Sequence, residues 1–400
     1  MLFNIETIHE THARMIDKHK AAIFTTLIQH GPMARRDLTR NLRLRSTTVS
    51  NLVKELISDG LVTEGIYNNS RKPGRPNLSL RPVPERLIAA TIYVEDHKFI
   101  GSLVDIAGNV LAQKMVEIPA EGTNTEIFDG LEEILITLKE KIPEGSEFLG
   151  VGISVVGTVD SRNNIWVNAD RWPMIHDLNI GTLADKIGAP IILRRNLDIE
   201  LEYMLEKNPP WSKENTVLFH WGFGVGGAYA YHGRVLDSPF GRYMDIGHII
   251  IHPESKKICR CGGYGCVESE AAIYALLPTF RTKFPGLREK SVDIDAILAD
   301  PNVFDIPGIK PAVDTVGLCL SNLFKIFYPH RMFLVGSFVR NAKIVERLEQ
   351  IILETFYNKM KETVHRVDLI VIPDGFTGCT WSNAYPFFRK RLKTLLSVKK

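Results

Sequence analysis

Residues 247–268 read GHIIIHPESKKICRCGGYGCVE, and this stretch decides how the rest of the chain is interpreted. His248 is followed, after ten residues, by Cys259, Cys261 and Cys266. One imidazole and three thiolates form the donor set of a closed tetrahedral zinc site, which leaves no position for a catalytic water. Glycines between the cysteines let the backbone turn sharply enough for the sulfur atoms to converge. We therefore expect a structural zinc ion here, with three unliganded thiols as the alternative.

Two acidic residues flank the expected zinc site. Asp245 lies three residues before His248, and Glu268 lies two residues after Cys266. A metal-held loop would bring both carboxylates close to the imidazole, an arrangement that suits the hydroxyl groups of a sugar. Either residue could instead be a solvated surface acid. The glycines of residues 222–227 form a second candidate site, because their backbone N–H groups could bind a phosphate or a sugar, although glycines also permit tight sheet corners.

The N-terminal segment, residues 1–81, differs from the rest of the chain in charge and in pattern. Its first 80 residues carry 12 Lys and Arg against 7 Asp and Glu, whereas the remaining 320 carry 37 against 39. Apolar spacing predicts three helices: one around residues 23–28, one over residues 34–41, and one that starts at Ser46 and stops at Asp59-Gly60. The third helix has a full apolar stripe, formed by Val49, Leu52, Val53, Leu56 and Ile57.

The opposite face of the third helix, together with the segment after it, predicts DNA binding. Two short strands, residues 61–64 and 78–80, would form a hairpin around a basic loop and complete a winged helix-turn-helix. Small polar side chains let a helix approach base edges, and a Gly-Arg-Pro turn can enter a narrow minor groove. The expected DNA contacts are Arg45, Thr47, Thr48, Ser50, Asn51 and Lys54 on the helix side and Arg71, Lys72, Gly74, Arg75 and Pro76 in the wing. A generic helical bundle with a flexible linker is the alternative.

From residue 82 onward the pattern is that of an α/β protein. Expected helices at residues 127–142 and 313–327 alternate with expected strands at residues 87–94, 99–104, 148–159, 191–193 and 331–335 and with an expected strand pair within residues 216–231. Such alternation predicts two similar α/β lobes, residues 82–195 and residues 196–380. We expect the second lobe to carry the zinc site and a dimer interface. A basic helix over residues 381–400 is expected to pack on the first lobe.

Composition restricts the class of protein. The chain has 400 residues, of which 44% are apolar and 24% are charged, and this usage excludes a disordered chain, a collagen and a coiled-coil rod. No apolar run reaches the roughly 18 residues that a membrane span needs, and no apolar secretory signal is visible at the N-terminus. We therefore expect a cytoplasmic protein without a membrane span. Five cysteines, three of them clustered, favour metal binding over disulfides in that compartment.

The stretch from Gly247 to Glu268 resembles the signature of the ROK family, which is named for repressors, open reading frames and kinases. The winged helix with Gly74-Arg75-Pro76 resembles the repressor branch of that family, which includes regulators of glucose, N-acetylglucosamine and xylose genes. The resemblance covers essentially the whole chain. It implies a two-lobed, actin-like ATPase and sugar-kinase (ROK) fold behind the DNA-binding head, and an effector site formed by Gly157, Asn196, Asp198, Asp245, His248 and Glu268.

The sequence departs from the family's kinases at the residues that handle ATP and the sugar. Residues 94–99 read VEDHKF where the kinases carry an Asp-x-Gly-x-Thr phosphate loop. The family's catalytic base corresponds to Asn196 if residues are counted from Pro190, and to Asp198 if they are counted back from Glu206. An asparagine amide cannot accept the proton of a sugar hydroxyl. Asp245 stands where the family usually has a glutamate, one methylene longer. The resemblance with these departures implies that kinase activity is lost.

We therefore expect a sequence-specific DNA-binding repressor whose degenerate sugar-kinase body senses a sugar or a sugar phosphate. A homodimer, or a dimer of dimers, would place two winged helices on a palindromic operator in double-stranded DNA. Two alternatives remain open. One is an active ROK hexose kinase with an appended DNA-binding head, and the other is a regulator switched by a protein partner.

Overall fold

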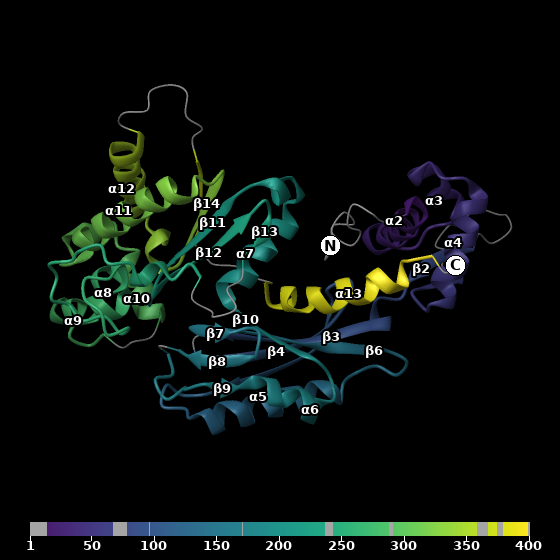
Figure 1. Cartoon of the computed structure of the whole chain (residues 1–400), viewed down its shortest axis with the longest axis horizontal. Coiled ribbons are helices and arrows are strands. Elements are labelled where there is room, and N and C mark those ends of the chain that lie inside the picture. The colour runs from purple at the N-terminus through teal and green to yellow at the C-terminus, as the bar shows by residue number, and fades with distance from the viewer. Residues whose placement is uncertain are drawn as a thin grey trace. The chain divides into compact units, whose positions relative to one another are not determined.

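The computed structural model divides into two compact units (Figure 1). The first unit comprises Met1–Arg194 together with Thr380–Lys400, and the second comprises Arg195–Cys379. None of the helices that the structure describes is both long and apolar enough to cross a membrane. The described residues are 14–66, 78–95, 97–169, 171–236, 243–287, 291–357, 367–373 and 379–398.

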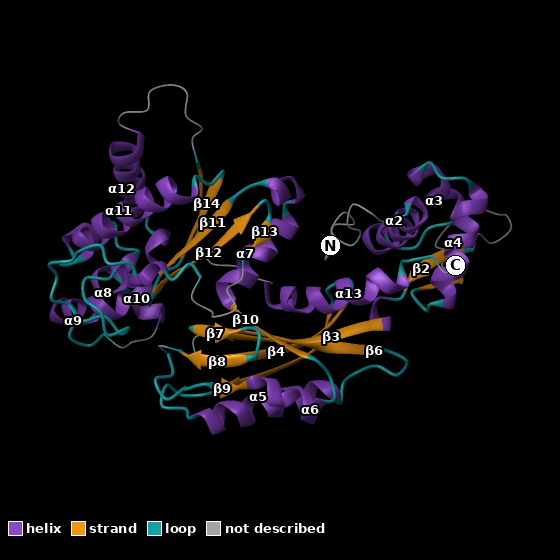
Figure 2. Ribbon diagram, viewed as in Figure 1, coloured by secondary structure: helices purple, strands orange, loops and turns teal. Residues whose placement is uncertain are grey.

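The first unit contains a five-stranded sheet in the order β10-β6-β3-β4-β5. Figure 2 draws the strands in orange and the helices in purple. Strand β3 pairs antiparallel with β4, β4 pairs antiparallel with β5, and β3 pairs in parallel with β6. Helix α5 packs on this sheet through buried Ile127, Leu131 and Ile134. The bounds are β3 (Leu87–Glu95), β4 (Lys98–Asp105), β5 (Val110–Glu117), α5 (Asn124–Lys139), β6 (Glu147–Val155) and β10 (Ile191–Arg195).

A smaller antiparallel sheet, in the order β7-β8-β9, follows β6 in the first unit. Its core contains two completely buried tryptophans, Trp166 and Trp172, whose ring centroids lie 5.7 Å apart. The elements are β7 (Thr158–Asp160), β8 (Ile165–Asn168), β9 (Leu178–Asn179), the 3-10 turn η2 (Ile180–Thr182) and α6 (Leu183–Ile187).

The sheet of the second unit repeats the topology of the first, in the order β13-β12-β11-β14-β15. Here β11 pairs antiparallel with β12, β12 pairs antiparallel with β13, and β11 pairs in parallel with β14. The expectation of two similar α/β halves agrees with this shared order. The strands are β11 (Thr216–Trp221), β12 (Val225–Tyr231), β13 (Arg234–Val235), β14 (Arg331–Val335) and β15 (Asp368–Ile372).

Helices of the second unit pack around a large apolar core that includes Phe219, Trp221 and Phe338. Helix α11 buries Val313, Val316 and Leu320 at helical spacing, as the apolar pattern predicts. The helices and turns are α7 (Asn196–Lys207), η3 (Pro209–Lys213), η4 (Ile246–His248), α8 (Val267–Ala271), α9 (Ile273–Lys283), α10 (Ser291–Leu298), η5 (Val303–Asp305), α11 (Ile309–Phe327), η6 (Ser337–Arg340), α12 (Ala342–Ile352) and η7 (Leu353–Tyr357).

The head of the first unit has the three predicted helices and the predicted hairpin. They are α2 (Met15–His30), α3 (Arg35–Leu42), α4 (Ser46–Ser58) and the antiparallel strands β1 (Val62–Gly65) and β2 (Ser79–Pro82). Val49, Leu52, Val53 and Leu56 of α4 are buried, whereas Ile57, the fifth member of the predicted stripe, is only partly buried. The 3-10 turn η1 (Pro84–Arg86) then leads into β3.

The C-terminal helix is shorter than the predicted residues 381–400. It is α13 (Tyr385–Leu395), and the 3-10 turn η8 (Cys379–Ala384) precedes it. Pro386 occupies the first turn of α13, where a fixed backbone φ angle favours a helix start. Apolar residues of α13, among them Phe388 and Leu392, belong to the same buried core as α2, α4 and the adjoining face of β3.

Candidate functional site

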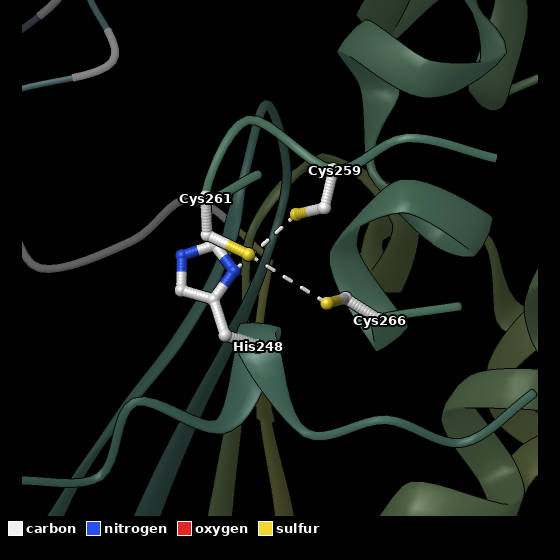
Figure 3. Close-up of side chains that lie close together, drawn as sticks. All are labelled: His248, Cys259, Cys261 and Cys266. Atoms are coloured by element: carbon white, nitrogen blue, oxygen red, sulfur yellow. Dashed lines mark hydrogen bonds between the residues drawn. The ribbon is translucent and has the colours of Figure 1, made fainter. Parts of the chain in front are cut away.

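The structure brings together the four predicted metal ligands of the second unit (Figure 3). His248 comes from the turn η4, and Cys259, Cys261 and Cys266 come from the loop that follows it. One ligand atom from each residue lies within 4.8 Å of every other. Cys259 Sγ lies 3.4 Å from His248 Nδ1, and Cys261 Sγ lies 3.8 Å from Cys266 Sγ. Three sulfurs and one imidazole nitrogen at this spacing fit a tetrahedral zinc ion.

Backbone contacts hold the loop in the shape that the ligands need. Ile250 forms an isolated bridge with Cys266, and Ile258 forms one with Tyr264. Gly265 has a φ of 65°, and a Cβ atom there would lie 1.9 Å from the carbonyl oxygen of His252. No residue with a side chain fits this position, so the glycine allows the chain to return past His252 to Cys266.

Burial changes the proton affinity of the thiols. It raises the pKa of Cys266 to about 12 and also raises the pKa of Cys259. Burial likewise raises the pKa of Tyr274, whose hydroxyl lies 3.7 Å from Cys259 Sγ. A zinc ion would bind these cysteines as thiolates and release their protons, which is the usual chemistry of a structural zinc site. The donor set therefore fits a metal, whose positive charge would offset the cost of forming buried thiolates at Cys259 and Cys266.

The two ring nitrogens of His248 face different groups. Nδ1 faces the cysteine sulfurs, whereas Nε2 lies 3.8 Å from Asp245 Oδ1. The Asp245 side chain is 46% exposed, so it can meet a small molecule from solvent. With Nδ1 on a metal, Nε2 would carry the proton and could donate a hydrogen bond beside the carboxylate. A hydrogen-bond donor and an acceptor next to each other match a sugar hydroxyl.

Glu268 is buried, which excludes the alternative that it is a solvated surface acid. It lies on α8, two residues after the ligand Cys266, and its Oε2 accepts the backbone N–H of Val225 at 2.9 Å. Gly224 and Gly247 pass close to this carboxylate, since a Cβ on either would lie 3.0–3.1 Å from Oε2. Glu268 thereby connects the loop of predicted metal ligands, residues 248–266, to the turn between β11 and β12.

The glycines of residues 222–227 serve close packing in the structure. The Gly222 N–H donates to the Gly224 carbonyl, and Gly226 and Gly227 lie in the ladder between β11 and β12. A Cβ on Gly227 would lie 2.7 Å from Ile246 Cδ1, so the glycine admits the turn η4 against the sheet. The N–H groups of Gly222 and Val225 thus already have acceptors inside the protein.

The turn between β3 and β4 belongs to residues 94–99, the stretch in which we expect a phosphate loop to be missing. Glu95 pairs with Lys98, so only two residues connect the strands. The His97 carbonyl accepts the Ile118 N–H at 2.9 Å, and the His97 ring meets the ring of Trp172 edge-on at 5.0 Å. The turn is short, and the Trp172 ring packs against its His97 side chain.

The remaining expected effector residues lie in both units. Asn196 and Asp198 start α7 in the second unit, and both are buried. Both carboxylate oxygens of Asp198 accept hydrogen bonds from Arg195, at 2.7 and 3.0 Å. Gly157 belongs to the first unit, between β6 and β7, with a φ of 88°. A Cβ there would lie 2.2 Å from the Asn168 carbonyl oxygen, so packing alone requires this glycine.

The predicted DNA-reading face of α4 is accessible in the head. Arg45, Thr47, Asn51 and Lys54 are exposed, and Thr48 and Ser50 are half-buried. The five wing residues, Arg71, Lys72, Gly74, Arg75 and Pro76, lie outside the described residues. Arg35 of α3 bonds the Ser50 carbonyl and both carboxylate oxygens of Glu64 on β1. This ion pair lowers the pKa of Glu64.

One polar group of the head has no counterpart in the sequence predictions. Lys20 of α2 is completely buried, and its Nζ lies 3.0 Å from a carboxylate oxygen of Glu55 and 3.0 Å from one of Asp59. Glu55 lies in the last turn of α4, and Asp59 follows that helix. The three charges therefore connect α2 to the end of α4. Their separation of 35 and 39 residues along the chain left no local pattern that could have predicted the contact.

Comparison with known proteins identifies relatives over most of the chain. The sequence profile of the ROK family matches residues 90–374. A putative xylose repressor of Caldicellulosiruptor sp. (strain Rt8B.4) is 24% identical over 340 residues, which are 80% of this chain and 82% of that protein. The sequence relationship therefore extends over most of both chains.

Two solved structures show the fold. A ROK family transcriptional regulator, a homologue of the E. coli Mlc protein, aligns with a TM-score of 0.69 and 22% identity over 96% of this chain and 98% of its own. A ROK hexokinase from Thermus thermophilus aligns with a TM-score of 0.58 and 21% identity over 76% of this chain and 99% of its own. The α/β sugar-kinase-like fold is thus confirmed. The hexokinase alignment leaves about a quarter of this chain unmatched.

Proposed function

Because this chain belongs to the ROK family, we propose that it is a DNA-binding transcriptional repressor whose sugar-kinase-like body senses a sugar or a sugar phosphate. The observation that carries the proposal is the accessible polar face of α4, which lies on a helical head with an adjoining hairpin. Thr47 and Asn51 are exposed on one side of this helix, and Leu52 and Leu56 are buried on the other. A helix of this kind can enter a major groove while its apolar face holds it on the head.

We assign residues 1–81 to DNA binding, with two kinds of contact. Thr48, Ser50 and Asn51 would reach base edges, because their side chains are short and can donate or accept hydrogen bonds. Arg45, Thr47 and Lys54 would position the helix on the phosphates. Arg71, Lys72 and the turn Gly74-Arg75-Pro76 would form the wing, with the Arg75 side chain in the minor groove.

We propose that residues 82–195 and 196–380 form the two lobes of the sensing body, and that the protein is a homodimer or a dimer of dimers in the cytoplasm. Exposed apolar side chains on the second lobe support an interface between copies. Ile249 and Ile326 are 41% and 67% exposed, and they border one groove of about 230 Å³ beside α11. A dimer would present two heads to a palindromic operator. Light scattering that gives the mass of a single chain, 45.1 kDa, would contradict this assignment.

We propose that the body binds a sugar without phosphorylating it. The two-residue turn between β3 and β4 supports the loss of kinase activity, because its His97 carbonyl already accepts the Ile118 N–H, its His97 ring meets Trp172, and it contains no glycine. The bonds from Arg195 to both oxygens of Asp198 also oppose a role of that carboxylate as general base. Asp245 and His248 are the residues that we propose to contact the sugar, next to a structural zinc ion on His248, Cys259, Cys261 and Cys266.

DNA selection from a random-sequence pool tests the proposal. The full-length protein should enrich a palindromic sequence, because two symmetric heads read two equal half-sites. Asn51→Ala should cost about 1–3 kcal/mol at one base position in each half-site. Asn302→Ala is the matched control, since Asn302 is exposed in the second unit, and it should leave the binding unchanged. No enriched sequence, or equal binding by both variants, would contradict a DNA-reading role of α4.

The wing is tested separately on DNA with A·T-rich or G·C-rich flanks. Arg75→Ala should weaken binding most on the A·T-rich flanks, because a narrow minor groove has the most negative potential. It should also reduce the salt dependence of binding. If the substitution weakened binding to both flanks equally, Arg75 would be a phosphate contact and the minor-groove assignment would be wrong.

A further inference from the structure

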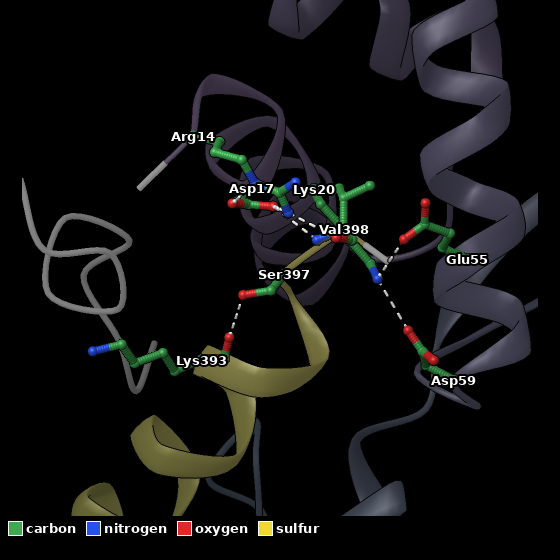
Figure 4. A network of polar contacts seen from close by, with 8 residues as sticks. All are labelled: Arg14, Asp17, Lys20, Glu55, Asp59, Lys393, Ser397 and Val398. Carbon is green, nitrogen blue, oxygen red and sulfur yellow. Dashed lines mark hydrogen bonds and ion pairs between the residues drawn. The ribbon is translucent and has the colours of Figure 1, made fainter. Parts of the chain in front are cut away.

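Val398, the last described residue, is bound by the N-terminal end of α2 (Figure 4). Asp17 Oδ1 accepts the backbone N–H of Val398 at 2.7 Å, and Arg14 Nη2 donates to the carbonyl oxygen of the same residue at 2.7 Å. Arg14 and Asp17 also form two hydrogen bonds with each other, both of 2.9 Å. One ion pair thus satisfies both backbone groups of a residue that is 381 positions away from Asp17 in the sequence.

The segment that ends at Val398 is anchored on the sheet of the first unit. Arg391 of α13 donates to Glu147 at the start of β6 at 2.9 Å. Asn383 donates to Ser154 near the other end of the same strand at 2.8 Å. The Phe387 ring lies over Gly150, where a Cβ would approach it to 2.3 Å. The C-terminal segment therefore follows β6 along its length and then reaches α2.

Helix α2 in turn holds the helix that carries the proposed DNA-reading face. The buried Nζ of Lys20 bonds Glu55 and Asp59 at the end of α4. Figure 4 shows that Lys20 lies one turn along α2 from the Asp17 carboxylate that binds Val398. Polar contacts consequently continue from β6 through α13 and Val398 to α2 and α4.

Apolar contact alone does not fix a direction between the head and the sheet. The head and the sheet share one apolar core, to which Leu56, Leu87 and Phe388 contribute. Apolar burial is roughly proportional to area and is non-directional, whereas hydrogen bonds require aligned donors and acceptors. The bonds to Val398 therefore add a directional constraint at the N-terminal end of α2.

We propose that Arg14 and Asp17 are positioning residues for DNA binding: by holding the backbone of Val398, they fix the orientation of the head on the body. This inference rests on the proposed function, since it concerns how two heads meet two half-sites. In a dimer with fixed heads, binding of one head to its half-site holds the other head near the second half-site at a high effective concentration. A head that is loosely held binds one half-site equally well and two half-sites less well.

Val398→Pro tests the proposal, because proline has no backbone N–H to donate to Asp17. Val398→Ala is the matched control, since it keeps both backbone groups and shortens only the side chain. In the full-length protein, Val398→Pro should weaken binding to the selected two-half-site DNA about tenfold and leave binding to a single half-site unchanged. The Val398→Pro protein should also keep its affinity when the two half-sites are moved apart by one or two base pairs. Loss of overall stability would not produce this property.

Two further variants and a second readout guard against a folding artefact. The double variant Arg14→Ala, Asp17→Ala, which removes both the donor and the acceptor, and a chain that ends at Ser397 should reproduce the effects of Val398→Pro. Without DNA, all three should exchange the backbone amide protons of the first turn of α2 at least about tenfold faster than Val398→Ala does. Equal exchange and equal spacing preference in Val398→Pro and Val398→Ala would overturn the proposal. Failure of the unmodified protein to bind DNA would instead contradict the proposed function.

Discussion

Two hairpin turns occupy equivalent places in the two sheets, and they are held by different chemistry. The turn between β3 and β4 has two residues between Glu95 and Lys98, and aromatic rings pack against it. The turn between β11 and β12 has three residues between Trp221 and Val225, two of them glycines, and the Glu268 carboxylate binds its last N–H. The topology around the two turns is the same.

The comparison shows that glycine content does not by itself make an anion site. The second turn has the glycines, yet the Gly222 and Val225 N–H groups have acceptors inside the protein, and one of these acceptors is a carboxylate. A phosphate site needs N–H groups that converge on an external anion. In this chain Trp172 contacts the first turn, and Glu268 of α8, the helix that follows the predicted metal ligand Cys266, binds the second turn. Each turn can therefore be disturbed without the other.

The largest effect is expected from loss of the metal. Structural zinc contributes about 10–16 kcal/mol of binding free energy in small zinc domains. Cys261→Ser should remove the stoichiometric zinc, lower the thermal midpoint of the second unit by at least about 5 °C, and leave the first unit unchanged. Elemental analysis and scanning calorimetry measure both effects. Cys319→Ser is the control, because Cys319 is a buried cysteine outside the cluster, and this variant should bind zinc as the unmodified protein does. Absence of zinc from the unmodified protein would contradict the proposed zinc site.

The next largest effect should come from the tryptophans that support each turn. Trp172→Ala should destabilise the first unit by about 3–5 kcal/mol, because the side chain is completely buried against Phe99 and Trp166. Trp221→Ala should cost the second unit a similar amount, since this ring stacks on Phe338 at 4.0 Å. Denaturant unfolding followed by fluorescence would separate the two units. If each variant destabilised both units equally, the turns would not be independent.

A smaller effect is expected at Glu268. Glu268→Gln keeps an acceptor for the Val225 N–H but replaces a charged hydrogen bond with a neutral one, so it should cost about 1 kcal/mol. The exchange of the Val225 amide proton should accelerate accordingly. Glu254→Gln changes an exposed residue of the same loop and serves as the control. An unchanged Val225 amide in Glu268→Gln would show that the carboxylate does not hold the turn.

The smallest effect is expected at the first turn. His97 has a φ of 68°, a left-handed conformation that glycine adopts without steric cost. His97→Gly should therefore be more stable than His97→Ala by about 1 kcal/mol, as measured by denaturant unfolding. Neither variant should phosphorylate a hexose, because the turn remains two residues long. Phosphorylation by His97→Gly would show that one glycine restores an ATP site.

The sequence predicts local structure and the ligand set, and it misses contacts between distant residues. The spacing of Val49, Leu52, Val53 and Leu56 identified α4 and its free face, because a helix repeats every 3.6 residues. The clustering of His248, Cys259, Cys261 and Cys266 was predicted because the four residues lie within nineteen residues and have distinctive chemistry. Lys20 gave no such signal, since a lysine is rarely buried without partners and its partners lie in another helix.

The candidate effector residues illustrate the same difference. Asp245 and Glu268 look equivalent in sequence, as acids on either side of the metal loop. The structure separates them, because the Asp245 side chain is 46% exposed whereas Glu268 is buried and binds Val225. The binding of Val398 by Arg14 and Asp17 was also outside the reach of any local pattern, since it joins the two ends of the described chain.

One titration tests the central claim that a sugar-kinase-like body controls a DNA-binding head without phosphorylating the sugar. The full-length protein is bound to the DNA that it selects from a random pool and is titrated with hexoses, pentoses, N-acetylhexosamines and their phosphates in the presence of ATP and Mg²⁺. We predict that one sugar or sugar phosphate changes the DNA affinity by about 5–150-fold, a coupling of about 1–3 kcal/mol, and is recovered chemically unchanged. Phosphorylation of any of these sugars at about 1 s⁻¹, or DNA affinity that no sugar alters, would contradict the account.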